Sequence, residues 1–248
     1  MHVYDADFYR YQGAGSLRSA RLVVAALRRR LPLAVRSVVD LGCGAGGWLA
    51  AWKEQGCEVC GVDGDYAARE ARLTGAAEFR AHDLTRELAL GRRFDLAQCL
   101  EVAEHLPPAA APVLVASLCR HADLVLFSAA PPGQGGEHHV NERPYGYWRE
   151  LFAARGFAMH DPLRPGLLAD ARILPWYRYN TFLYVGERAS AALRESLADC
   201  RVAPGREPPD LAPWPYRLRR RVVALLPVAA ATALAVAKKR AFNTLGRR

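Results

Sequence analysis

The stretch VVDLGCGAGGW at residues 38–48 decides the fold of this chain. Its apolar start is typical of a buried strand that ends at Asp40, alternate glycines then form a tight loop, and a helix opens at Gly47. Glycine tolerates positive φ and lets the backbone approach a ligand closely, and the N-terminus of the following helix offers N–H groups. The stretch therefore predicts a strand–loop–helix unit whose loop binds a ligand.

A second acidic residue strengthens this interpretation. Asp63 ends the next apolar run, in EVCGVDGDY at residues 58–66, at about the spacing from the loop at which an acid holds a ribose diol in nucleotide-binding folds. Glycines at positions 42, 44 and 47 also satisfy the dinucleotide pattern GxGxxG, which is a weak signal by itself. From these letters alone, an NAD- or flavin-binding domain stays open as the alternative.

The rest of the chain alternates short apolar runs with helical patterns. Ser16 is placed to cap a helix over Leu17–Leu31, which Pro32 ends. Such alternation favours parallel strands joined by right-handed crossovers, and the length of 248 residues fits one α/β domain with an appendage. The predicted strands cover residues 36–41, 57–62, 77–81, 94–100, 123–129, 157–162 and 176–185, and the predicted helices between them cover 46–55, 65–73, 112–120 and 145–157.

The whole phrase around the loop resembles the class I S-adenosylmethionine (SAM)-dependent methyltransferases. The resemblance rests on Asp40 before the loop, Gly46 within it, Asp63, and AHDLT at residues 81–85, and it covers roughly residues 16–186. It implies an enzyme with an α/β, Rossmann-like, doubly wound seven-stranded sheet. That sheet would be mostly parallel with an antiparallel last strand, and helices would cover both of its faces.

The resemblance also assigns residues to SAM. It places Asp40 at the ammonium group, the loop backbone under the methionine moiety, Asp63 at the ribose, and Asp83 with the Leu84 N–H at the adenine. The implied cofactor-binding residues are Asp40, Gly42, Cys43, Gly44, Gly46, Asp63, Asp83, Leu84 and Glu101. Two alternatives stay open, namely Asp63 as the N-cap of the predicted helix 65–73 and Asp83 as the cap of a turn at 84–88.

A second set of chemically active side chains follows the fourth predicted strand, in EVAEH at residues 101–105. Glu101, Glu104 and His105 are spaced to converge on one side of a helical turn. Two carboxylates and an imidazole so close together favour a divalent cation, and His138 or His139 in the loop after the fifth strand would supply a further ligand.

This set resembles two groups of O-methyltransferases, those of ubiquinone biosynthesis and the small-RNA 3′-terminal 2′-O-methyltransferases, which carry EVxEH. The resemblance implies a hydroxyl acceptor and Mg²⁺ held by Glu101, Glu104, His105 and His139, with His138 as the alternative to His139. Coordination lowers the pKa of a hydroxyl and orients it. In the metal-free alternative, Glu101 contacts SAM, Glu104 braces the neighbouring helix, and His139 or His105 acts as the general base.

The loop PPGQGGEHHVNERP at residues 131–144 carries polar groups for the acceptor. It is long and rich in glycine and proline, and it follows a predicted strand, where such loops are usually functional. Its side chains suit a small-molecule or glycan-like acceptor. The alternatives are a small-molecule N-methyltransferase, RNA 2′-O-methylation, and a non-catalytic SAM-binding partner protein. The chain has no separate RNA-binding module, which disfavours a nucleic-acid partner.

The net charge of +9 is concentrated at the C-terminal end. Residues 1–186, the predicted methyltransferase domain, carry 21 Lys or Arg and 20 Asp or Glu, whereas the predicted extension, residues 187–248, carries 13 and 5. A nearly neutral body argues against a broad nucleic-acid-binding surface. The extension contains a proline-rich linker at 203–215 and an apolar run at 222–237 between two basic stretches.

The apolar run has three interpretations. It is shorter than the ~20 residues of a spanning helix, it resembles a membrane-surface helix whose basic flanks meet anionic lipids, and it also fits a helix packed on the body or a partly disordered tail. The six cysteines lie in patterns typical of buried thiols, and the polar start MHVYDADFYR does not resemble a signal peptide. We therefore expect a cytoplasmic protein, with membrane association through the basic extension.

Overall fold

The computed structural model describes residues 6–65 and 79–245, with side chains for 15–65 and 79–238. Its centre is a seven-stranded sheet in the order β3-β2-β1-β4-β5-β7-β6. Strands β1 to β5 are parallel, and β7 runs antiparallel to both β5 and β6, as the sequence predicts. The strands are β1 Ser37–Leu41, β2 Glu58–Asp63, β3 Phe79–Ala81, β4 Leu96–Leu100, β5 Leu124–Ser128, β6 Phe157–His160 and β7 Phe182–Gly186.

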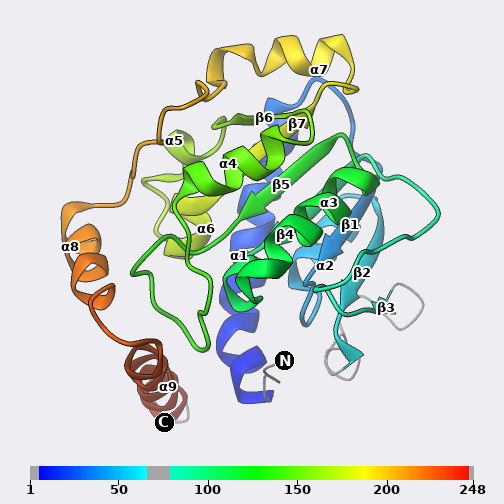
Figure 1. Ribbon diagram of the computed structural model, residues 1–248. Helices are drawn as coiled ribbons and strands as arrows, with labels where there is room; N and C mark the ends of the chain where they lie inside the picture. The colour runs from blue at the N-terminus through cyan, green and yellow to red at the C-terminus, as the bar shows by residue number, and fades with distance from the viewer. Residues whose placement is uncertain (1–5, 66–78, 246–248) are drawn as a thin grey trace.

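Helices cover both faces of the sheet, as Figure 1 shows. One apolar core packs α1 and α2 against the sheet around the buried Trp52, and the other packs α3 and α4 around Trp148 and Phe152. The doubly wound arrangement is therefore confirmed. The α-helices are α1 Ala6–Arg30, α2 Gly47–Lys53, α3 Ala111–His121, α4 Tyr145–Ala153, α5 Arg164–Leu167, α6 Pro175–Asn180, α7 Ala191–Ser196, α8 Trp214–Val223 and α9 Val228–Leu245, and the 3₁₀ turns are η3 Ala103–His105, η4 Pro108–Ala110 and η5 Ala198–Cys200.

The first helix is longer than the sequence predicts. It begins at Ala6, so Ser16 lies inside the helix, and its hydroxyl lies 3.2 Å from the hydroxyl of Tyr177 instead of capping. The glycines in QGAG at residues 12–15 disfavour a helix interior, which is why the pattern suggested a later start. The short helix predicted over residues 65–73 falls mainly on residues that lie outside the described part of the chain.

The predicted last strand, residues 176–185, is half helix. Residues Pro175–Asn180 form α6, and β7 begins only at Phe182. Aromatic residues favour strands, but a proline at the first helical position is pre-organised for a helix, and Pro175 occupies that position. The consequence is functional, because α6 directs Tyr177 and Asn180 towards the cavity described below.

Helices α8 and α9 of the C-terminal extension pack beside the loop at residues 131–144 (Figure 1). A guanidinium N–H of Arg219 in α8 donates to the Gln134 carbonyl oxygen at 3.1 Å, and the His138 N–H donates to the Thr232 hydroxyl in α9 at 3.3 Å. Among the described residues, no helix has the length and apolar character needed to cross a membrane. The division into a domain at 1–186 and an extension at 187–248 stays a prediction.

Candidate functional site

A cavity of about 510 Å³ opens where β1 and β4 end. This is the point at which the strand order of the sheet reverses, and in open α/β sheets ligands bind at such a point. The glycine loop lines one side of the cavity, and the turn after β4 and the loop at 131–144 line the other, together with α6, α8 and α9. The volume is in the usual range for small-molecule sites.

The glycine loop has the backbone that its sequence predicts. Gly42, Gly44 and Gly46 have φ values of 87°, 51° and 80°, in the left-handed region that favours glycine. A Cβ added to Gly42 would overlap the side chain of Val102, so this position also needs the space. Gly46 is the N-cap of α2, and the Gly42 N–H donates to the Val62 carbonyl oxygen at 2.7 Å.

Asp40 is a buried residue that lines the cavity, and it is 3 % exposed. Burial raises its pKa to about 7, an effect that a hydrogen bond with Gln98 opposes and the nearby Asp63 reinforces. A positive charge next to Asp40 would favour the ionised form of its carboxylate. This buried carboxylate therefore suits a ligand with a cationic group.

The two acids predicted at the ribose and the adenine lie outside the cavity lining. Asp63 accepts from the backbone N–H of Gly44 at 2.8 Å and of Gly64 at 2.7 Å, so it holds the loop in shape. The Asp83 carboxylate accepts from the N–H and the hydroxyl of Thr85, and these bonds lower its pKa. This is the turn-capping arrangement that the sequence left open as the alternative for Asp83. Of the predicted cofactor residues, Asp40, Gly42, Cys43, Gly44 and Glu101 line the cavity, whereas Gly46, Asp63, Asp83 and Leu84 do not.

Glu101 is held in place by two amide side chains. The Gln134 amide donates to its carboxylate at 2.6 Å, and the Asn180 amide donates at 3.2 Å. Its φ of 57° is unusual for a residue with a side chain, and such strain persists where surrounding structure fixes it and is common at functional sites. Burial raises the pKa of Glu101, and the Gln134 and Asn180 bonds oppose that effect.

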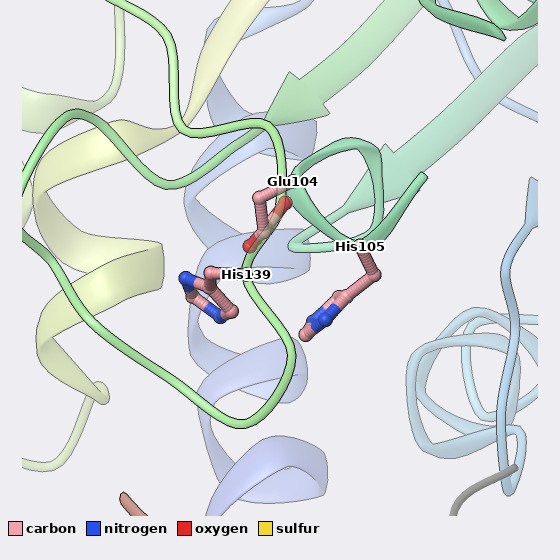
Figure 2. A group of neighbouring side chains, drawn as sticks. All are labelled: Glu104, His105 and His139. Carbon is pink, nitrogen blue, oxygen red and sulfur yellow. The ribbon is translucent and has the colours of Figure 1, made fainter. Parts of the chain in front are cut away.

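Glu104, His105 and His139 converge in the cavity from the turn after β4 and the loop at 131–144, as Figure 2 shows. One possible ligand atom from each lies within 4.8 Å of the others, and the two imidazole centroids are 4.7 Å apart. The predicted His139, rather than His138, reaches this group. Glu101 is not part of it among the described residues.

The Glu104 carboxylate is fully buried, and among the described residues neither of its oxygens has a hydrogen-bond partner. Burial raises its pKa well above the usual range, and the neighbouring Glu101 adds to that shift. Burying a polar atom without a hydrogen-bond partner costs free energy, unless a bound ion or another group interacts with it. The donor set of one carboxylate and two imidazoles therefore fits a divalent cation.

His139 also has the support that metal-binding histidines usually have. The Glu142 carboxylate lies 2.8 Å from its Nδ1 and accepts backbone N–H bonds from Gly133 and Gly135, each at 2.7 Å. A ligating histidine usually donates its second N–H to such a carboxylate. Gly136 leaves the space for the ring, because a Cβ there would overlap the His139 imidazole.

Sequence reasoning missed three residues that contribute to the cavity. Asn180 was assigned to a strand, but it is the last residue of α6, and its amide binds Glu101. The available signal was the change from an aromatic run to a polar residue at this position. Tyr216 and Arg219 of α8 were assigned to a separate extension, yet both line the cavity. No local signal in the sequence pairs these residues with a loop that lies about 80 positions earlier.

Comparisons with known proteins agree with this geometry. Residues 16–130 match the family described as Methyltransferase domain. The ubiquinone biosynthesis O-methyltransferase of Alkalilimnicola ehrlichii is 31% identical over 129 residues, which are 49% of this chain and 47% of that protein. The enzyme of the same name from Pseudomonas paraeruginosa is 32% identical over 136 residues, 51% of this chain and 53% of that protein. The chain thus spans about half the length of the curated relatives that it matches.

Solved structures show the same fold at low identity. A sugar N-methyltransferase from Streptoalloteichus aligns with a TM-score of 0.59 at 20% identity, covering 75% of this chain and 94% of that one. The magnesium protoporphyrin IX methyltransferase of Synechocystis with bound SAM aligns with a TM-score of 0.55 at 19% identity, covering 73% and 90%. The predicted resemblance is confirmed over residues 16–130, which match a methyltransferase domain, and the solved structures show the predicted fold.

Proposed function

We propose that this chain is a SAM-dependent O-methyltransferase that acts on a hydroxyl of a small-molecule or glycan-like acceptor. The observation that carries the proposal is the buried Glu104 carboxylate, which faces His105 and His139 in the same cavity that the glycine loop lines. An alcohol is a weak nucleophile, and a base or a cation at this place would activate it. The names of the curated relatives support oxygen as the acceptor atom.

The glycine-loop side of the cavity would hold the cofactor. Methyl transfer is an in-line displacement at a carbon that the sulfonium already activates, so the protein contributes mainly by holding the two reactants in line. Asp40, Gly42 and Gly44 line the cavity, where the Asp40 carboxylate would pair with the ammonium group of SAM and the backbone at Gly42 and Gly44 would hold the methionine moiety. Asp63 stabilises that backbone through its bond to the Gly44 N–H.

On the acceptor side, this chain's residues hold the hydroxyl and its proton. Glu142 occupies Nδ1 of His139, which leaves Nε2 for the acceptor proton or for a cation. Mg²⁺ held by Glu104, His105 and His139 would lower the pKa of a bound hydroxyl and fix its orientation. Gln134 and Asn180 fix the position of the Glu101 carboxylate, which lines the same cavity. The cytoplasmic location expected from the sequence stays a prediction.

Titration calorimetry with S-adenosylhomocysteine and then Mg²⁺ tests both sides separately. We expect S-adenosylhomocysteine to bind the wild type and Glu104→Gln alike, and Mg²⁺ to release heat only with the wild type. Glu87→Gln is the matched control, because that carboxylate is exposed, does not line the cavity and pairs with Arg120. Absence of S-adenosylhomocysteine binding would overturn the proposal. Binding without a Mg²⁺ response would exclude Mg²⁺ as the bound cation and favour His139 or His105 as the base.

A further inference from the structure

The C-terminal helix pair, α8 and α9, presents an unusual apolar surface. Among the described side chains, eight large apolar residues are exposed, and seven of them lie between Trp214 and Leu234. Trp214 is 68% exposed and Leu225 is 85% exposed. Single exposed apolar residues are normal, whereas a concentration of them marks an interaction site.

Five of these residues lie along α8 and directly after its end, and we call them the outer ridge. Trp214, Leu218 and Val222 are four residues apart on α8 and so lie on one face of the helix. Leu225 and Leu226 extend the ridge at the end of the helix. Arg217 and Arg221 are both exposed and lie beside the ridge, because each is one helical turn from its members.

The opposite face of α8 is fixed to the body of the protein, so the outer ridge is held away from it. Val223 is buried, and a Cβ on Gly133 would overlap the Arg220 carbonyl oxygen, which shows how closely the helix approaches the loop. Arg220 pairs with Asp210 at 3.1 Å. The rings of Tyr216 and Tyr179 pack with their centroids 5.6 Å apart.

The charge around the ridge selects its partner. Residues 216–248 contain nine Lys or Arg and no Asp or Glu. An apolar strip with arginines beside it matches the interface of a bilayer that contains anionic lipids, where apolar side chains enter the acyl boundary and basic ones meet the headgroups. Nucleic acid would pair with the basic residues but would leave the apolar side chains of the ridge exposed to water. A second copy of this chain would bring like charges together.

We propose that the outer ridge and the flanking arginines dock this protein on an anionic bilayer surface, with α8 seated between the bilayer and the cavity. The inner face of α8 and part of α9 line the cavity through Tyr216, Arg219, Val223, Ala231 and Ala235. Docking therefore places the acceptor side of the cavity next to the membrane. This last step rests on the proposed function, whereas the docking itself does not.

Flotation of the full chain with lipid vesicles tests the docking. We expect binding to vesicles of phosphatidylcholine with phosphatidylserine, little binding to phosphatidylcholine alone, and weaker binding as salt rises. Arg217→Gln with Arg221→Gln should weaken binding about fivefold per arginine, because a basic residue near an anionic surface contributes about 1 kcal/mol. Leu218→Ser with Val222→Ser should weaken it further. The controls are Arg18→Gln with Arg36→Gln for charge and Leu33→Ser for exposed apolar surface.

Three results would overturn the docking. They are absence of vesicle binding, equal binding to neutral and anionic vesicles, and loss of a dimer in light scattering when the ridge is changed, which would make the ridge a contact between two copies. Every variant is also titrated with S-adenosylhomocysteine, and we expect wild-type affinity. A wild-type chain that binds vesicles but not S-adenosylhomocysteine would contradict the proposed function and still support the docking.

Discussion

The two sides of the cavity are built in different ways. The cofactor side is a short piece of backbone, residues 40–48, whose shape comes from glycines and from bonds to the neighbouring strand β2. The acceptor side is assembled from side chains of four segments, with Glu104, His139, Asn180 and Arg219 as examples. The cofactor side therefore depends on local backbone conformation, and the acceptor side depends on long-range packing.

Asp40→Asn gives the largest expected effect and tests the cofactor side. The folded-state pKa of Asp40 is about 7 against an ordinary value of 3.8. Because the pKa is raised, its contribution to stability is fully present at low pH and is lost as pH rises from about 4 to about 7. The unfolding free energy falls by about 4 kcal/mol over this range, because one pKa unit corresponds to ~1.4 kcal/mol.

We therefore expect Asp40→Asn to be more stable than the ligand-free wild type at pH 8 but not at pH 4, in urea unfolding. The same variant should bind S-adenosylhomocysteine more weakly at pH 8, and wild-type affinity should fall below about pH 7, where the carboxylate gains its proton. A stability difference that does not depend on pH would show that burial does not raise this pKa.

Gly42→Ala tests whether the loop backbone needs glycine for conformation or for space. At Gly42 the φ is 87° and Val102 occupies the space of a Cβ, whereas at Gly91 the φ is 70° and nothing lies within 4 Å. Strain alone costs about 1 kcal/mol at either site, and the overlap with Val102 adds about 1–3 kcal/mol. We expect Gly42→Ala to lower the unfolding free energy more than Gly91→Ala and to weaken S-adenosylhomocysteine binding. Equal losses would show that Val102 moves away without cost.

Gly136→Ala tests the acceptor side without changing any side chain that carries chemistry. The added methyl group displaces the His139 ring. We expect Mg²⁺ affinity to fall about 10- to 100-fold, as for lost support of a ligand, with S-adenosylhomocysteine affinity unchanged. Gly166→Ala is the control, because a Cβ there meets nothing within 4 Å. A parallel loss of S-adenosylhomocysteine binding would mean that the two sides are not separate.

Thr232→Val gives the smallest expected effect. It removes the hydroxyl that accepts the His138 N–H, a bond worth about 1 kcal/mol. We expect faster proteolysis of α9 and an unchanged melting temperature for the rest of the chain, measured by mass spectrometry of the fragments and by calorimetry. A lowered main transition would show that α9 also stabilises the sheet.

How much the sequence predicts follows the same division. The glycine loop and the mostly parallel seven-stranded sheet depend on local patterns and on a fold that constrains them, and both were predicted. The set Glu104, His105 and His139 was also predicted, because two of its members are adjacent and the loop that carries the third is identifiable. Asn180 was not, because the aromatic residues before it favour a strand.

The amides that hold Glu101 illustrate the limit more generally. Gln134 and Asn180 meet the same carboxylate from segments 46 residues apart, and no spacing rule links them. Contacts of α8 with the loop at 131–144 are of the same kind. A residue pattern within one segment predicts the secondary structure of that segment. Contacts between segments that are distant in the sequence form only when the whole chain folds, so no local pattern predicts them.

The position of α8 has an evolutionary consequence. The helix lines the acceptor side of the cavity, yet it lies well beyond residues 16–130, the part that matches the methyltransferase family. A lineage in which the segment that contains α8 was replaced would keep the residues that bind the cofactor. It would have different side chains around the acceptor. Selection for new acceptors can therefore act on the end of the chain while the glycine loop stays unchanged.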